Sequence, residues 1–99
     1  MGGREVTVKQ TVADSIALIA WYIESKGLVA TADKFADDVY DFFIKLSDSR
    51  KTHALCRDPD RALFGYKCVS YKKKYTVVFL ETHEDLIICE FIPSKNSHW

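Results

Sequence analysis

The sequence lacks the features that mark membrane-spanning, low-complexity or exported chains. Its longest run without a charged side chain is nine residues, 15–23, which is too short to cross a bilayer. Only four glycines and two prolines occur among 99 residues, which excludes collagen-like and low-complexity sequence. No basic and apolar leader with a small-residue cleavage site is present. We therefore expect a cytoplasmic protein that does not enter a membrane.

The chain also has little that would support metal or cofactor chemistry. It contains no Walker loop, no G-x-G-x-x-G, no H-E-x-x-H and no G-x-S-x-G. The three cysteines, Cys56, Cys68 and Cys89, form no C-x-x-C or C-x-x-H pair. An odd number of cysteines without an export signal favours reduced thiols, which we expect to serve as small apolar side chains in strands. The sequence therefore predicts no metal, no cofactor and no small-molecule substrate.

What is present is the composition of one folded domain over residues 1–99. Hydrophobic residues make up 47% of the chain and charged residues 28%, which is ordinary for a globular protein. The net charge is zero, but residues 1–49 carry −3 and residues 50–74 carry +6. A basic segment in a neutral protein can bind a polyanion or an acidic partner.

The first half of the chain predicts a strand and two helices. Residues 4–9 alternate between apolar and polar side chains, as a half-buried strand does. Thr11 is the predicted N-cap of a helix over residues 12–26, which ends at Gly27. Thr31 is the predicted N-cap of a second amphipathic helix, which ends at residues 47–49. So few residues separate the two helices that we expect an antiparallel helical hairpin.

The second half predicts a polar loop and three strands. The loop covers residues 50–61, with a short turn of structure at residues 53–56. Strands follow over residues 62–71, with a bulge at Gly65, over residues 74–81 and over residues 86–92. The predicted fold is α+β in the order β-α-α-β-β-β, a mostly antiparallel four-stranded sheet with the helical hairpin packed on one face. The predicted core comprises Val8, Ile16, Ile19, Ile23, Phe35, Val39, Phe42, Val77, Phe79, Ile88 and Phe91.

The basic segment also contains aromatic side chains and a histidine. Cations bind phosphates and aromatic rings stack on unpaired bases, so this composition favours RNA binding and permits RNA cleavage without a metal. The alternatives are a solvated basic surface and local ion pairs of Arg57 with Asp58 and of Arg61 with Asp60. The predicted RNA-binding residues are Arg57, Arg61, Tyr66, Lys67, Lys72, Lys73 and Lys74.

Several short motifs follow one another along residues 4–95. A strand leads into a helix with V-x-x-x-I-x-x-I spacing from Val12, and the second helix ends in F-x-x-L from Phe43. An R-x-P loop then begins at Arg57, a Gly-Tyr-basic strand at Gly65, and K-Y-x-V-x-F at Lys74. In this order and spacing the chain resembles the RelE/ParE superfamily, the toxins of type II toxin–antitoxin modules.

The resemblance implies a plasmid-stabilization toxin that an acidic antitoxin protein neutralises. We expect the antitoxin to bind across the sheet and the helical hairpin, near Leu28 and Val29. RelE-like members cut messenger RNA on the ribosome with scattered Lys, Arg, Tyr or His residues, whereas ParE-like members inhibit DNA gyrase. Where many members have a His-x-x-Arg-like segment, this chain has residues 93–96, with Pro93 at the histidine position.

The predicted function is that of a ribosome-dependent endoribonuclease, an mRNA interferase. The alternatives are inhibition of DNA gyrase and a non-catalytic interaction domain that retains the toxin fold. In the nuclease, the arginines would steady the phosphate and His98 would act as general acid or base. The candidate catalytic residues are Arg57, Arg61, Lys67, Lys95 and His98.

Overall fold

The computed structural model describes residues 3–48 and 53–96. These residues form helices α1 (Gln10–Ser25), α2 (Val29–Leu46) and α3 (Pro59–Leu63). The strands are β1 (Glu5–Val8), β2 (Lys67–Tyr71), β3 (Tyr75–Glu81) and β4 (Asp85–Pro93), and a short 3-10 helix, η1 (Ser94–Asn96), follows β4. The fold class is therefore α+β, as predicted. In the described ranges, no helix is both long enough and apolar enough to cross a membrane.

The four strands form one open, mixed sheet in the order β1-β4-β3-β2. β3 is antiparallel to both β2 and β4, whereas β1 runs parallel to β4. Parallel neighbours require a long connection, and the chain between β1 and β4 provides one that contains α1, α2, α3, β2 and β3. The chain returns from α2 to the start of β1, where the Arg4 N–H donates a hydrogen bond of 2.8 Å to the Ser47 carbonyl.

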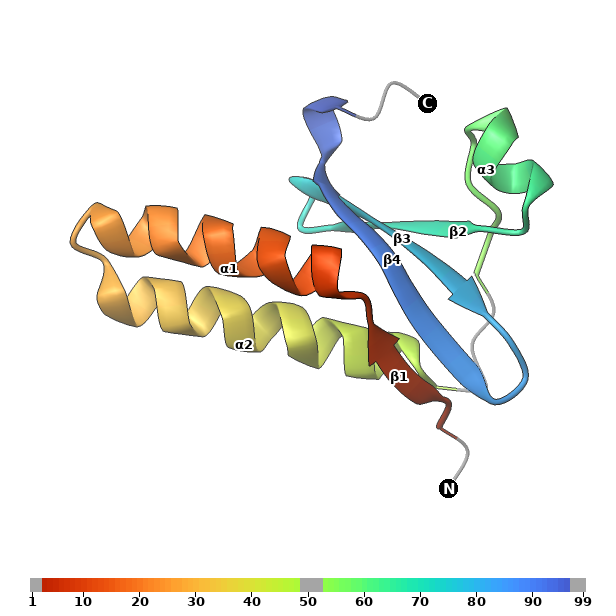
Figure 1. Ribbon diagram of the computed structural model, residues 1–99, viewed down its shortest axis with the longest axis horizontal. Coiled ribbons are helices and arrows are strands. Elements are labelled where there is room, and N and C mark those ends of the chain that lie inside the picture. The colour runs from red at the N-terminus through yellow and green to blue at the C-terminus, as the bar shows by residue number, and fades with distance from the viewer. Residues whose placement is uncertain (1–2, 49–52, 97–99) are drawn as a thin grey trace.

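The helical hairpin covers one face of the sheet, and its closed end extends beyond the sheet edge (Figure 1). Six of the predicted core residues are buried between these layers: Ile16, Val39, Val77, Phe79, Ile88 and Phe91. Val8, Ile19, Phe35 and Phe42 are partly buried against this core. Ile23 is also half-buried, because it lies toward the end of the hairpin that projects past the sheet.

Phe43 takes the central core position that helical spacing assigned to Phe42. Phe43 is 0% exposed, and its ring makes an edge contact with Phe91, at 6.2 Å between centroids. Phe42 instead packs against Tyr71 at the margin of the core. Residues 42 and 43 differ by 100° around the helix, so the rotation of α2 about its own axis decides which ring points inward.

Both helices begin before their predicted caps. α1 starts at Gln10 because Lys9 already has extended backbone and accepts hydrogen bonds from the Val12 and Ala13 N–H groups. α2 starts at Val29, with Leu28 at its N-cap, so Thr11 and Thr31 lie inside the first helical turns. Neither helix has a side-chain cap. The predicted end of α1 is confirmed, since Gly27 has a φ of 83°, a left-handed conformation that favours glycine.

Residues 53–66 differ most from the prediction. α3 covers the end of the predicted loop and residues 62–63 of the predicted strand, because Pro59 at the first helical turn suits a helix start. Gly65, with a φ of 82°, ends this helix instead of forming a bulge, and β2 begins only at Lys67. Residues 53–56 form no helical turn; Leu55 makes an isolated antiparallel bridge with Lys67. The sheet irregularity lies between Val78 and Phe79.

Candidate functional site

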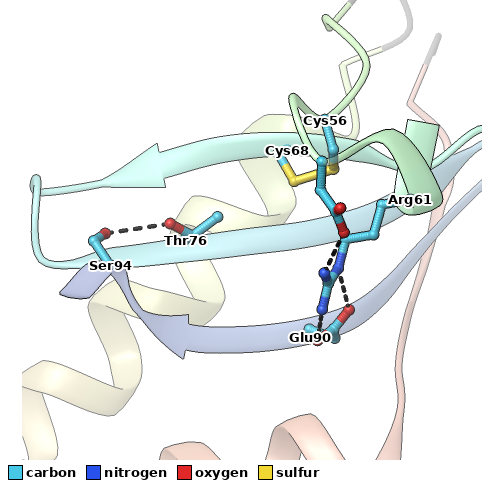
Figure 2. Close-up of a disulfide and its surroundings, with 7 residues drawn as sticks. Cys56, Arg61, Cys68, Thr76, Glu90 and Ser94 are labelled. Atoms are coloured by element: carbon cyan, nitrogen blue, oxygen red, sulfur yellow. Dashed lines mark hydrogen bonds and ion pairs between the residues drawn. A yellow bond between two sulfur atoms is a disulfide. The ribbon is translucent and has the colours of Figure 1, made fainter. Parts of the chain in front are cut away.

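Residues 53–66 are here called the arm. Its first residue, His53, contacts the core residue Phe79, with 5.2 Å between the ring centroids, and from Cys56 onward the arm is attached to the sheet face opposite the helical hairpin. Val69, Val77 and Phe91 belong to the core beneath the helices. Successive side chains of a strand point to opposite faces, so their neighbours Cys68 and Glu90 face the other side. The arm reaches this face through the side chains of Cys56 and Arg61 (Figure 2).

Arg61 is held by two carboxylates. Its Nε donates to Glu90 Oε2 at 2.9 Å and its Nη2 to Glu90 Oε1 at 2.8 Å, which makes a two-pronged pair between α3 and β4. Its Nη1 donates to Asp58 Oδ2 at 2.6 Å. The hydrogen bonds to Glu90 contribute most to raising the pKa of Arg61 above its ordinary value. Arg61 was predicted to pair with Asp60 or to steady a phosphate; in the structure its partners are Asp58 and Glu90.

Lys67 is likewise engaged by the protein. Its ammonium group donates to the His53 carbonyl at 2.8 Å. The His53 ring forms a 2.8 Å contact from Nδ1 to Glu81 Oε2, and Arg4 Nη1 lies 3.5 Å from the same oxygen. The His53 and Glu81 side chains are only 13% and 7% exposed. Lys67 and His53 therefore anchor the start of the arm to the sheet and do not face an open ligand site.

The prediction of three reduced thiols is wrong for two of them. Cys56 and Cys68 form a disulfide, with their Cα atoms 4.7 Å apart (Figure 2). Their 12-residue separation gave no recognisable motif, and they pair because the bridge between Leu55 and Lys67 sets the two segments side by side. Cys89 is a free, buried cysteine, as predicted, and burial raises the pKa of its thiol.

The remaining candidate residues fall into separate places. Arg57 is exposed and lines an open groove of about 350 Å³ together with Ala54, Leu55, Cys68, Val69, Ser70 and Thr76. Tyr66 is half-buried. Lys72 lies over the Tyr71 ring and 3.7 Å from Asp38. His98 lies outside the described residues. The four candidate catalytic residues that the structure describes, Arg57, Arg61, Lys67 and Lys95, thus do not line one common groove.

A different cluster forms between α1, the β2–β3 turn and η1. It is an open groove of about 640 Å³, lined by Leu18, Ile19, Trp21, Tyr22, Lys73, Lys74, Tyr75, Pro93, Ser94 and Lys95. Leu18, Trp21 and Tyr22 are 66%, 64% and 58% exposed, which is unusual for large apolar side chains that lie together. Among the described residues, none forms an ion pair with Lys73, Lys74 or Lys95. We call this the Trp21 groove.

Comparison with known proteins gives no match: no family model, curated protein or solved structure matches this chain. In the described part of the chain, no three His, Cys, Asp or Glu side chains are gathered so that they could hold a metal ion. The two features that distinguish the surface are therefore the Trp21 groove and the arm with its two attachments.

Sequence reasoning missed the apolar half of the groove and the partner of Arg61. Leu18 and Trp21 lie off the spacing of Val12, Ile16 and Ile19, and this offset was the available signal that they face outward. Glu90 is the only charged residue within the apolar run 86–92. A lone carboxylate in a strand otherwise suited to burial indicates a cationic partner across the sheet face.

Proposed function

We propose that this chain is the toxin of a type II toxin–antitoxin module, with a RelE/ParE-type fold. The observation that carries the proposal is the combination of element order and layers. Apart from α3, the chain has the expected β-α-α-β-β-β succession, with a four-stranded sheet and a helical hairpin on one face, and this supports the proposal. The arm with α3 is an addition to that frame. A toxin of this type acts inside the cell, so the cytoplasm is the proposed location.

The geometry favours a toxin that acts by binding its target over one that cleaves RNA. The Arg61 guanidinium is neutralised by Asp58 and Glu90, and the Lys67 ammonium group is bound to a carbonyl. Electrostatic catalysis requires preorganised donors aimed at the developing charge, and these donors are aimed at protein acceptors. Inhibition of DNA gyrase is therefore the proposed mode, and ribosome-dependent cleavage is the second candidate, supported by exposed Arg57 and Lys95.

The proposed partner is an acidic antitoxin segment in the Trp21 groove. An apolar floor of Leu18, Ile19 and Pro93 suits the apolar side of an amphipathic segment. The ammonium groups of Lys73, Lys74 and Lys95 around it suit carboxylates of that segment. Exposed Leu28 and Val29 lie at the hairpin end, near which we expected the antitoxin to bind from the sequence.

Inducible expression tests the proposed function. We expect growth arrest that co-expression of an adjacent small acidic open reading frame reverses. Two results together would support inhibition of gyrase: messenger RNA that stays intact in the arrested cells, and inhibition of supercoiling when the purified protein is added to purified gyrase. Messenger RNA cut at ribosomal A sites would instead show that the toxin is a ribosome-dependent nuclease. Normal growth of cells that contain the soluble, folded protein would show that it is not a toxin and would favour the non-catalytic interaction domain.

Variants of the groove test the antitoxin site. Trp21→Ala removes an exposed aromatic anchor and should weaken antitoxin binding about 10–100-fold. Ile44→Ala, at a residue on α2 that is also exposed, is the matched control and should change affinity little. A Lys73→Glu and Lys74→Glu double variant should weaken binding most at low salt, because salt screens exposed charges. A Lys34→Glu and Lys45→Glu double variant on α2 controls for the same change in net charge.

A further inference from the structure

The arm is attached to the two ends of one row of residues across the sheet. Cys68 on β2 pairs with Val78 on β3, and Val78 pairs with Glu90 on β4. The arm is bonded to the first of these through Cys56 and to the last through Arg61 (Figure 2). Val78, between the two attachments, is 0% exposed although it faces away from the helices. One covalent bond and one ion pair thus close the arm over this row.

The two cysteine residues of the covalent attachment differ in exposure. Cys56 is 5% exposed, whereas Cys68 is half-buried and lines the open groove beside Arg57. Cys68 is therefore the residue through which a thiolate from solution approaches the bond, and the positive charge of Arg57 favours the approach of an anion. The Arg61 and Glu90 side chains of the other attachment are 28% and 35% exposed, so water screens that ion pair.

We propose that Cys56 and Cys68 are a redox-modification site at which a low-mass thiol, such as glutathione, releases the arm from the sheet. The thiolate bonds to the Cys68 sulfur, the Cys56–Cys68 bond breaks, and the Cys56 thiolate leaves and takes a proton. A second thiol then attacks the mixed disulfide. Cys68 is left as a thiol, and the two reductant molecules leave as their own disulfide, having supplied two electrons.

Release follows from the length of the loop that the bond closes. The two cysteines are 12 residues apart, and closure of a loop of this size favours the joined state by roughly 10²-fold. After reduction the hydrogen bonds of His53 and the bridge of Leu55 with Lys67 still hold the start of the arm, whereas residues 57–65 keep the solvent-screened ion pair of Arg61 with Glu90. Disulfides that form in a reducing compartment are mostly transient or redox-sensing. The reducing compartment, and the consequence for toxicity through movement of Arg57 and Arg61, rest on the proposed function.

The experiment compares the oxidised and reduced chain in solution. Intact mass and thiol titration follow the bond in buffers of graded glutathione ratio, in a Cys89→Ala background so that one thiol pair remains. Hydrogen exchange then measures residues 57–65 and β4 in both states. On reduction we expect exchange in residues 57–65 to rise about 10–100-fold while exchange in β4 is unchanged. A Cys56→Ser and Cys68→Ser variant should exchange rapidly in the arm with or without reductant.

Three results would overturn the proposal. Two thiols that stay reduced in oxidised glutathione would show that the pair does not form. Unchanged exchange in residues 57–65 after complete reduction would show that the bond does not hold the arm. Exchange that rises equally in β4 would make the bond a staple of the whole fold. None of these readouts depends on growth arrest, so they fail independently of the toxin proposal.

Discussion

The turn between β2 and β3 contains a backbone conformation that its side chains disfavour. Lys72 and Lys73 have φ values of 51° and 60°, and the Lys74 N–H closes the turn by donating to the Tyr71 carbonyl at 3.1 Å. Positive φ at both central positions is the type I′ geometry, which Asn-Gly adopts with least strain. For a side chain with a Cβ, this conformation costs about 1–2 kcal/mol per residue.

Replacing Lys72 by Asn and Lys73 by Gly should therefore stabilise the protein. Asn tolerates the left-handed region and Gly has no Cβ, so most of the strain is removed. The change also removes an exposed contact of Lys72 with Asp38 at 3.7 Å, which is worth only a few tenths of a kcal/mol. We expect a net gain of about 1–2 kcal/mol, which for a domain of this size raises Tm by roughly 5–15 °C.

Thermal and urea unfolding measure the gain. Lys74→Gly is the matched control, because Lys74 does not have a positive φ. There glycine only adds freedom to the unfolded chain and should cost up to about 1 kcal/mol. Equal effects of glycine at positions 73 and 74 would refute the strain argument.

The stabilised variant should also bind the antitoxin more weakly, because Lys73 lines the Trp21 groove. A function for that lysine would explain why a strained turn retains it.

Three further predictions concern the arm, the core and Cys89. Arg61→Gln leaves Glu90 without its two-pronged partner and should lower the free energy of unfolding in urea by about 1–2 kcal/mol. The variant should still cause growth arrest. If a folded Arg61→Gln variant did not cause arrest, Arg61 would be a residue needed for activity. Phe43→Ala should cost about 3–5 kcal/mol, against less than half of that for Phe42→Ala at the core margin, and the reverse order in thermal unfolding would contradict the assigned rotation of α2. The raised pKa of buried Cys89 means that the unfolded chain loses the thiol proton at lower pH than the folded chain. Stability should therefore fall as pH rises above about 8.5, the ordinary thiol pKa, and this part of the decline should be absent in Cys89→Ala.

The candidate site was only partly accessible to sequence reasoning. Residues 72–73, which separate two predicted strands, form a turn in the structure. Which cations remain available depended on partners distant in the chain. Glu90 pairs with Arg61 across 29 positions, and the His53 carbonyl receives Lys67 across 14. A charged residue has the same appearance in a sequence whether its partner is water or a carboxylate, so local reasoning could not separate Arg57 from Arg61.

By itself, the sequence determined the elements whose cause is local. Apolar residues at helical spacing produced α1 and α2, Gly27 ended α1, and three apolar stretches of the second half became strands, because these features act within a few residues of the chain. Tertiary structure alone decided the parallel pairing of β1 with β4, the inward ring of α2 at Phe43, and the disulfide of Cys56 with Cys68. Each of these depends on how close folding brings segments that are far apart in sequence. The number of residues between two segments does not tell how far apart they lie in the folded protein.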